Sequence, residues 1–183
     1  MINKFLALVI FLILSPLLLI GSLIILINDG FPIFFLQKRV GKNNKYFTIF
    51  KFRTMKKNTK DVATHLAENF ESNILYLGHF LRKYSIDEIP QLINIIKGDM
   101  NFIGPRPALF NQYDLIELRE KHNIHSVKPG ITGWAQVNGR DSLSIIKKIE
   151  HDTYYIQNKG ILLNFKIVYR TIIKVILAKD IKE

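Results

Sequence analysis

The stretch FLALVIFLILSPLLLIGSLIILI, from Phe5 to Ile27, contains 23 residues without a charge. A helix that crosses a bilayer needs about 20 apolar residues, so this stretch is long enough to enter a membrane. A signal peptide fits poorly, because its apolar region is usually about 7–15 residues long and ends at a small-residue cleavage site. We therefore expect a membrane-associated protein whose N-terminal segment, residues 1–30, lies in the bilayer.

Two features of this stretch bear on its path through the membrane. Ser15-Pro16 lies at its middle, where proline removes a backbone hydrogen bond and kinks a helix, and the Ser15 hydroxyl can supply a partner for a freed carbonyl. Lys4 precedes the stretch and a basic segment starting at Lys38 follows it, so the positive-inside rule places both ends in the cytoplasm. The residues alone leave two interpretations open, a kinked spanning helix and a re-entrant helix–break–helix.

The chain is strongly basic, with a formal net charge of +11 that is concentrated near the N-terminus. Residues 1–60 contain ten lysines and arginines and a single acid, Asp29. This surplus indicates an anionic partner: nucleic acid, anionic lipid or a phosphorylated substrate. Bases are interleaved with aromatic residues from Tyr46 to Arg53, in a predicted hairpin, and beside an apolar segment this favours lipid headgroups over single-stranded nucleic acid.

The segment SIDEIPQL, residues 85–92, places two adjacent carboxylates, Asp87 and Glu88, in this basic chain. Ser85 and Glu88 match an S-x-x-E pattern ahead of an apolar run, which predicts a capping box and a helix over residues 86–97. The helix dipole would favour ionised carboxylates in that first turn. An ionised Asp can act as a nucleophile and an ionised Glu can bind a divalent cation, although the pattern also fits a capped helix with no further role.

Two loops have compositions suited to anion contacts. In GPRP, residues 104–107, the prolines hold the backbone around Arg106 rigid, and a guanidinium meets phosphate oxygens in bidentate fashion. A surface turn with a solvated arginine is the alternative. Residues 127–140 place three glycines and several side-chain donors around the only tryptophan, which is typical of a phosphate- or sugar-binding loop rather than of a core segment.

The remaining periodicity predicts a helix-dominated α+β fold. Further helices are expected over residues 61–84, 108–123, 142–158 and 161–177. The last of these is amphipathic, with a basic stripe formed by Lys166, Arg170 and Lys174, which is the pattern of a helix in the membrane interface. Packing of its apolar face on the protein's own core explains the pattern equally well. The sequence contains no cysteine and no zinc-binding histidine spacing.

Six sequence blocks resemble, in order, the small monotopic polyprenyl-phosphate phosphoglycosyl transferases (the PglC-like type) of the bacterial sugar transferase family. The blocks are QKRVG (37–41), FKFRTM (50–55), LRKYSIDEIPQL (81–92), GDM (98–100), GPRP (104–107) and KPGITGWAQVNGR (128–140). The resemblance runs nearly end to end. It implies a re-entrant helix broken at Ser15-Pro16, a compact cytoplasmic catalytic domain over residues 31–183, and interfacial amphipathic helices.

The resemblance implies transfer of a phosphosugar from a UDP-sugar to undecaprenyl phosphate, with Mg²⁺ as cofactor, a covalent intermediate and UMP as product. In the family's pattern Asp87 is the nucleophile and Glu88 is the metal ligand. Phosphate-binding residues are expected at Arg82, Arg106, Arg53 and Lys51. Contacts to the nucleotide or sugar are expected from Thr132, Gly133, Gln136, Asn138 and Arg140. The sugar is expected to be an N-acetylated amino sugar.

The expected location is the cytoplasmic face of the bacterial inner membrane, with no nucleic acid among the partners. An alternative from another class is a non-catalytic, membrane-anchored basic module that binds anionic lipid or nucleic acid. This alternative accounts for the N-terminal charge but gives no reason for an acidic pair among the bases. One conflict is left open by the residues, because a Glu88 that folds back onto the Ser85 N–H is less free to bind Mg²⁺.

Overall fold

The computed structural model describes residues 1–57 and 73–177. Its α-helices are α1 (Ile2–Asp29), α2 (Tyr76–Lys83), α3 (Leu92–Lys97), α4 (Tyr113–Lys121), α5 (Trp134–Val137), α6 (Ile145–Asn158) and α7 (Ile161–Leu177). The strands are β1 (Phe34–Val40), β2 (Tyr46–Phe52), β3 (Asn101–Ile103) and β4 (Gly130–Thr132). Short 3₁₀ helices are η1 (Lys42–Asn44), η4 (Ile86–Gln91), η5 (Ile124–Ser126) and η6 (Arg140–Ser142). The predicted helix-dominated α+β fold is confirmed.

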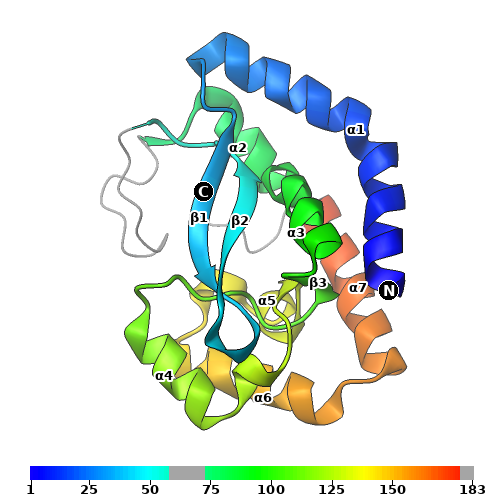
Figure 1. Cartoon of the computed structure of the whole chain (residues 1–183), viewed down its shortest axis with the longest axis vertical. Coiled ribbons are helices and arrows are strands. Elements are labelled where there is room, and N and C mark those ends of the chain that lie inside the picture. The colour runs from blue at the N-terminus through cyan, green and yellow to red at the C-terminus, as the bar shows by residue number, and fades with distance from the viewer. Residues whose placement is uncertain (58–72, 178–183) are drawn as a thin grey trace.

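Helix α1 is apolar and long enough to cross a membrane, as its sequence predicts. The predicted break at Ser15-Pro16 is wrong, because α1 is one helix with Pro16 inside it. Pro16 cannot donate to the Leu12 carbonyl, and Ser15 Oγ donates to that carbonyl instead, at 2.8 Å. The helix therefore stays hydrogen-bonded and bends, and Figure 1 shows it turning partway along its length.

One face of α1 packs on the rest of the protein along both halves of the helix. In the first half Ala7 is fully buried in a core cluster with Leu92 and Ile95 of α3. In the second half Ile25 is buried with Phe52 of β2. The other face consists of large apolar side chains that are exposed, namely Phe5, Leu6, Leu8, Leu12, Ile13, Leu17, Leu19, Ile20, Leu23 and Ile27. A surface of this kind needs an apolar environment.

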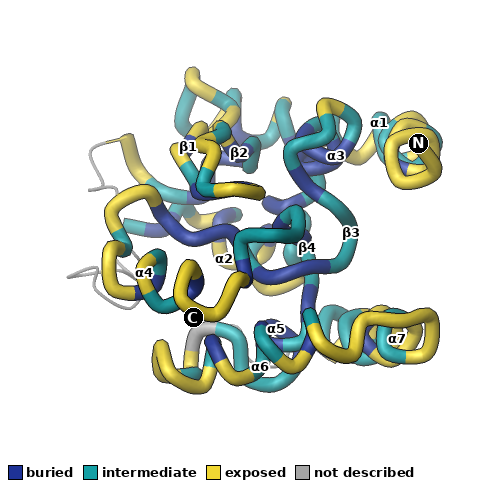
Figure 2. The backbone as a smooth tube through the Cα atoms, turned by 60° about the horizontal axis from the view of Figure 1, so that its bottom comes forward, coloured by how far each residue is buried: buried dark blue, intermediate teal, exposed yellow. Residues whose placement is uncertain are grey.

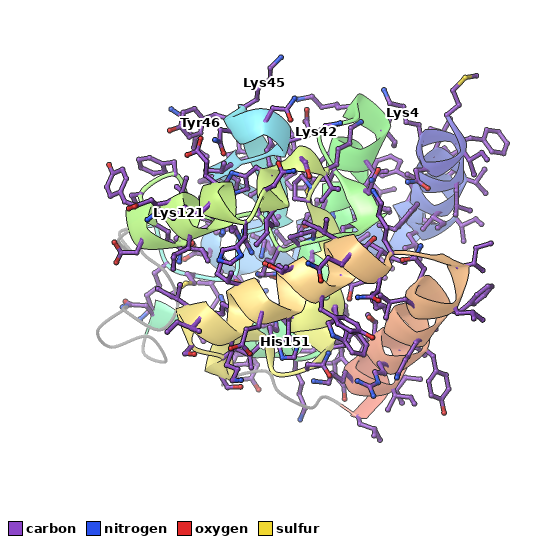
Figure 3. The ribbon with its side chains drawn as sticks, turned by 90° about the horizontal axis from the view of Figure 1, so that it is seen from below. Lys4, Lys42, Lys45, Tyr46, Lys121 and His151 are labelled. Atoms are coloured by element: carbon purple, nitrogen blue, oxygen red, sulfur yellow. The ribbon has the colours of Figure 1, made fainter. Side chains whose placement is uncertain are left out.

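The predicted hairpin is confirmed: β1 and β2 pair antiparallel from Phe34 opposite Phe52 to Val40 opposite Tyr46. The side chains of its turn project from one end of the molecule in Figure 3, where Lys45 points outward. A second, parallel pair joins β3 to β4. Gly130, the first residue of β4, lies against the backbone of Gly104. A Cβ on Gly130 would be only 2.1 Å from the Gly104 nitrogen. Only glycine permits this approach of the two segments.

The capping box predicted at Ser85 and Glu88 is wrong. Ser85 is left-handed, with φ of 53°, and its side chain makes no capping hydrogen bond. Residues 86–97 form η4 followed by α3 instead of one α-helix. Pro90 explains the difference, because it cannot donate to a carbonyl four residues earlier and the tighter 3₁₀ turn avoids the clash. The Glu88 side chain is consequently not used as a cap.

Three other predicted segments differ from the structure. Most of the helix expected over residues 61–84 lies outside the described residues, and its described part is helical only in α2. The helix expected over 108–123 is confined to α4. The Val40 N–H donates to the Ala108 carbonyl, and the Leu109 N–H donates to the Gln112 side chain, so Ala108 and Leu109 are held outside the helix. Residues 127–140, expected to be a loop, contain β4 and α5, and all of them are buried or half-buried.

The helices expected over 142–158 and 161–177 are confirmed as α6 and α7, α6 beginning three residues later than predicted. Ile167 of α7 is fully buried against Val137 and Tyr155. The opposite face of α7 exposes Ile161, Leu162, Phe165, Val168, Tyr169, Ile172, Ile176 and Leu177. Figure 2 shows exposed surface along both α1 and α7, which lie at opposite edges of the same side of the molecule. Most of the apolar face of α7 is thus not covered by the protein's own core.

We expect Gly78→Ala to destabilise the protein. Gly78 brings α2 against the segment that follows β2, and a Cβ there would lie 2.4 Å from the Thr54 carbonyl oxygen. Backbone must shift to accommodate it, at a cost of about 1–3 kcal/mol. Gly160→Ala is the matched control, because the nearest atom to its Cβ lies at 3.9 Å. Thermal unfolding in detergent should show a lower Tm for the first variant only, and equal Tm values would contradict this packing.

Candidate active site

Glu88 is buried, and its Oε1 atom accepts hydrogen bonds from three cationic side chains. Lys51 Nζ lies at 2.8 Å, Arg106 Nη2 at 3.0 Å and Arg140 Nη2 at 3.3 Å. Only 6% of the surface of Glu88 is exposed, so the carboxylate is largely removed from water. Burial of a charge is costly unless it is paired and hydrogen-bonded, and the three cations meet that condition.

The three cations reach Glu88 from distant parts of the chain. Lys51 is near the end of β2, which packs against η4. Arg106 lies on the loop after β3, and Arg140 follows α5. The hairpin and the parallel β3–β4 pair thus bring three segments to one carboxylate. The structure brings these residues together at Glu88, while their roles stay predictions.

Asp87 and Glu88 are neighbours with opposite titration behaviour. Burial raises the pKa of Asp87 above its usual range, and the nearby charge of Glu88 adds to this, although Lys51 and Arg82 oppose it. Burial alone would also raise the pKa of Glu88, but Arg106, Lys51 and Arg140 outweigh it and hold that pKa well below the usual range. The expectation that a helix dipole favours ionisation of both acids is therefore wrong for Asp87.

The cluster also acts on Lys51. Burial lowers the pKa of its ammonium group and the charge of Arg106 adds to this, whereas Glu88 opposes both. A buried lysine is kept charged by its carboxylate partner, so Lys51 and Glu88 depend on each other. Such perturbed titratable groups in one buried cluster are characteristic of functional sites.

The loop that carries Arg106 is held by its carbonyl groups. Pro105 and Pro107 have no N–H to donate, so this loop is anchored mainly through carbonyl groups that accept hydrogen bonds. The carbonyl of Pro105 accepts from Gly130 N–H at 3.0 Å, and that of Pro107 accepts from Arg39 Nη1 at 3.0 Å. The predicted rigidity of the loop thus has a second source besides the proline rings.

Arg119 completes this anchoring and was not predicted from the sequence. Its Nη1 donates to the Arg106 carbonyl at 2.7 Å, and its Nη2 pairs with Asp152 Oδ2 at 2.7 Å. Both side chains are buried, at 4% and 1% exposure. A basic residue within α4 and an acid within α6 resemble ordinary surface charges in sequence, and only their position in the fold identifies them.

Two predicted phosphate-binding arginines are placed differently. Arg82 Nη1 donates to Thr54 Oγ1 at 3.3 Å, and its charge acts on Asp87, so it borders the acidic pair. Arg53 instead lies at the C-terminal end of α1, where it pairs with Asp29 and donates to the Pro32 carbonyl at 2.6 Å. In this structure Arg53 anchors the C-terminal end of α1 to the rest of the protein.

Of the five residues predicted to contact nucleotide or sugar, Arg140 alone bonds to the carboxylate pair. Thr132 is hydrogen-bonded to Thr171 at 2.7 Å, and Asn138 accepts from Arg170 at 2.8 Å. Gly133 and Gln136 lie against the Gly104 carbonyl. These four residues connect β4 and α5 to neighbouring elements, and their predicted ligand contacts remain untested.

The acidic side chains of the site are compatible with only one mode of magnesium binding. Within residues 1–57 and 73–177 no group of three or more His, Asp, Glu or Cys side chains is placed to hold a metal. Mg²⁺ is usually bound through one or two carboxylates together with substrate phosphates and water. The buried carboxylate of Glu88 therefore fits an ion that is shared with a phosphorylated substrate, and it does not fit a closed structural metal site.

Comparison with known proteins identifies the family of this chain. The sequence profile described as bacterial sugar transferase matches residues 1–178. The chain belongs to the bacterial sugar transferase family. The family resemblance indicated by the six sequence blocks is therefore confirmed. The acidic pair and its surrounding cations thus lie in a member of a transferase family.

Three relatives illustrate the similarity. The sugar transferase EpsL of Bacillus subtilis is 40% identical, over 92% of this chain and 82% of EpsL. The UDP-N-acetylgalactosamine-undecaprenyl-phosphate N-acetylgalactosaminephosphotransferase of Aeromonas hydrophila is 42% identical, over 86% of this chain and 38% of its own length. The UDP-glucose:undecaprenyl-phosphate glucose-1-phosphate transferase of Escherichia coli is 38% identical, over 92% of this chain and 38% of its own length. The chain thus spans most of EpsL but well under half of the other two.

The opposite pKa shifts predict opposite stability changes for Asp87→Asn and Glu88→Gln. The ionised form of Asp87 is disfavoured by folding, so wild-type stability falls as pH rises through its raised pKa and the Asn variant avoids that loss. Ionised Glu88 stabilises the fold above its unfolded-state pKa, and this stability disappears as pH falls through its lowered pKa. At neutral pH we expect Asp87→Asn to unfold at a higher temperature than wild type.

Glu88→Gln should unfold at a lower temperature at neutral pH, losing about 1–3 kcal/mol because three cations lose a charged acceptor. Thermal unfolding measured from acidic to neutral pH checks both signs, since both differences should shrink in acid. Shifts of the same sign in the two variants at neutral pH would refute the assignment of opposite pKa shifts.

Proposed function

We propose that this protein transfers a sugar phosphate from a UDP-sugar to undecaprenyl phosphate, releasing UMP and forming undecaprenyl-diphosphate-sugar. The observation that carries the proposal is the buried Asp87–Glu88 pair, to which distant segments contribute cations. Two relatives are named for reactions on undecaprenyl phosphate, one with UDP-N-acetylgalactosamine and one with UDP-glucose.

The chemistry requires a nucleophile that can attack an anionic phosphate. In the first step a carboxylate oxygen of Asp87 attacks the phosphorus that bears the sugar, and the bond from this phosphorus to the bridging oxygen breaks, so that UMP leaves with that oxygen. In the second step a phosphate oxygen of undecaprenyl phosphate attacks the same phosphorus, and the bond to Asp87 breaks. The carboxylate is regenerated, and the two substrates use one site in turn.

Charge neutralisation is the main task of the surrounding residues. Arg106, Arg140 and Lys51 already converge on one point, and each can donate to phosphate oxygens in place of Glu88. The charge of Arg82 also acts on Asp87. In the proposal Glu88 would also hold Mg²⁺, which would supply further neutralisation of the phosphate charge.

We infer that α1 is re-entrant, because both of its ends are bonded to the same domain. At the start, Lys4 Nζ donates to the Lys97 carbonyl at 3.2 Å, and Figure 3 shows Lys4 next to the end of α3. At the end, Asp29 pairs with Arg53. A 28-residue helix is about 40 Å long and a bilayer core about 30 Å thick, so a straight spanning helix would separate these ends by the membrane.

Helix α7 supports a position on the membrane surface. Its apolar side chains point outward, whereas the polar side chains Arg170 and Thr171 bond to the domain. An amphipathic helix packed in this sense leaves its apolar face for lipid. With basic residues flanking α1 on both sides, the proposed location is the cytoplasmic face of the bacterial inner membrane.

The alternative of a non-catalytic basic module is not favoured. Such a module would present its cations to an external anion, whereas Lys51, Arg106 and Arg140 are directed at a buried carboxylate. The sugar is left open by the relatives, whose names specify N-acetylgalactosamine in one case and glucose in another. An N-acetylated amino sugar stays our prediction, to be decided by a panel of UDP-sugars.

We expect wild-type protein in lipid nanodiscs to release UMP from one UDP-sugar when undecaprenyl phosphate and Mg²⁺ are present. Asp87→Asn should lose at least about 10³-fold in rate, as expected for removal of a nucleophile, while it remains folded and membrane-bound. Glu88→Gln should be impaired with a changed dependence on Mg²⁺. Near-normal turnover by folded Asp87→Asn would eliminate Asp87 as the nucleophile.

The topology is tested with single cysteines, since the chain has none of its own. Ile2→Cys and Phe31→Cys lie at the two ends of α1, where the native side chains are exposed. With a membrane-impermeant maleimide added to spheroplasts, neither should react until the membrane is permeabilised. Reaction of Ile2→Cys from outside would establish a spanning helix, and a periplasmic cysteine reporter confirms that the reagent is active.

A further inference from the structure

The polar face of α7 is bonded to the segment that leads to Arg140. Arg170 Nη1 donates to Asn138 Oδ1 at 2.8 Å, and its guanidinium carbon lies 5.1 Å from the centroid of the Trp134 ring. Lys166 Nζ lies over the same ring at 5.4 Å. Tyr154 of α6 stacks on Trp134 at 5.6 Å, so the aromatic platform is itself fixed. Arg170 and Lys166 of the predicted basic stripe thus both contact protein.

Asn138 connects this platform to the candidate active site. Its Nδ2 donates to the Trp134 carbonyl at 2.7 Å, so the amide is held from two sides. Gly139 and Arg140 follow with positive φ values of 147° and 49°. A left-handed arginine is uncommon and persists where the surrounding structure enforces it. Arg140 Nη2 then reaches Glu88 Oε1 at 3.3 Å.

We propose that Arg170 is a positioning residue for the transfer reaction. By holding Asn138, Arg170 fixes the turn at Gly139 and thereby aims Arg140 at the carboxylate pair. Helix α7 then has two separate tasks, because its outward apolar face seats the protein on lipid and its inward face sets the cation that meets the donor diphosphate. This inference rests on the proposed function for its kinetic consequence, although the positioning itself is a structural property.

A merely structural role for Arg170 would be limited to attaching α7. Loss of that attachment would disturb the lipid-facing surface and therefore the use of undecaprenyl phosphate. Loss of positioning would act on Arg140 and therefore on the use of the UDP-sugar. The two substrates thus distinguish the two roles, provided that variants on the two faces of α7 are compared.

The kinetic experiment compares Arg170→Met with Phe165→Asp, which alters the exposed face of α7. We expect Arg170→Met to raise the KM for the UDP-sugar, or to lower the corresponding kcat/KM, about tenfold. The KM for undecaprenyl phosphate should stay within twofold. Phe165→Asp should instead raise the KM for undecaprenyl phosphate and leave the KM for the UDP-sugar within twofold. Lys147→Met, which removes an exposed charge on α6, is the control and should match wild type.

A double-mutant cycle identifies Arg140 as the target. In an Arg140→Met background the additional effect of Arg170→Met should disappear, because the residue that it positions is gone. Arg170→Lys should restore part of the donor kinetics, since it can donate to Asn138 but lacks the planar group that lies over Trp134. Fully additive effects, or a defect confined to the lipid substrate, would overturn the proposal.

Hydrogen exchange tests the positioning without any turnover. Backbone amides of residues 138–142 should exchange about tenfold faster in Arg170→Met than in wild type, including the Ser142 amide that bonds to the Gly139 carbonyl at 3.0 Å. Amides in the middle of α6 should be unchanged. Unchanged exchange at 138–142 would overturn the inference even in an active enzyme. Absence of UMP release from wild type with faster exchange in the variant would instead refute only the proposed function.

Discussion

The pairing of Glu88 with three cations is the interaction on which the rest of the described structure depends. A carboxylate with 6% exposure is stable only if its charge is compensated, and the partners come from β2, from the loop after β3 and from the turn after α5. The hairpin delivers Lys51, the parallel β3–β4 pair with its close contact at Gly130 delivers Arg106, and the turn after α5 delivers Arg140. The small sheets therefore act mainly as supports that bring distant cations together, while the helices supply most of the core.

A second constraint follows from the prolines around Arg106. They remove two N–H groups, so the loop is fixed through its carbonyls by donors from elsewhere, including Arg119 and Arg39. Arg119 can be buried there only because Asp152 balances its charge, and burial in turn raises the pKa of Asp152 while Arg119 opposes that rise. Positioning one guanidinium at the acidic pair thus requires a second, fully enclosed ion pair. The precise position of Arg106 thus depends on the buried charges of Arg119 and Asp152.

The sequence predicted the elements with strong local signals, namely α1, the hairpin, α6, α7 and the acidic pair. It failed where long-range contacts override local preference. The capping box at Ser85 satisfied a local pattern, but Pro90 and the cations around Glu88 enforce a 3₁₀ turn instead. Residues 127–140 looked too polar and glycine-rich for a core, yet those glycines permit the backbone contacts that bury the segment. Arg119 and Asp152 carry no local signal at all.

The conflict between capping and metal binding at Glu88 is resolved by the fold, which replaces it with a different competition. Glu88 does not bond to the Ser85 N–H through its side chain; it bonds to Lys51, Arg106 and Arg140. A donor diphosphate offers these same three groups equivalent acceptors, so under the proposed function the cations can pass from Glu88 to phosphate with little loss of hydrogen bonding. Glu88 then keeps its charge and needs a new counter-ion at the moment when the substrate arrives. Under the same proposal a divalent cation held by Glu88 would meet that need, and substrate phosphates would supply the ligands that a single carboxylate lacks.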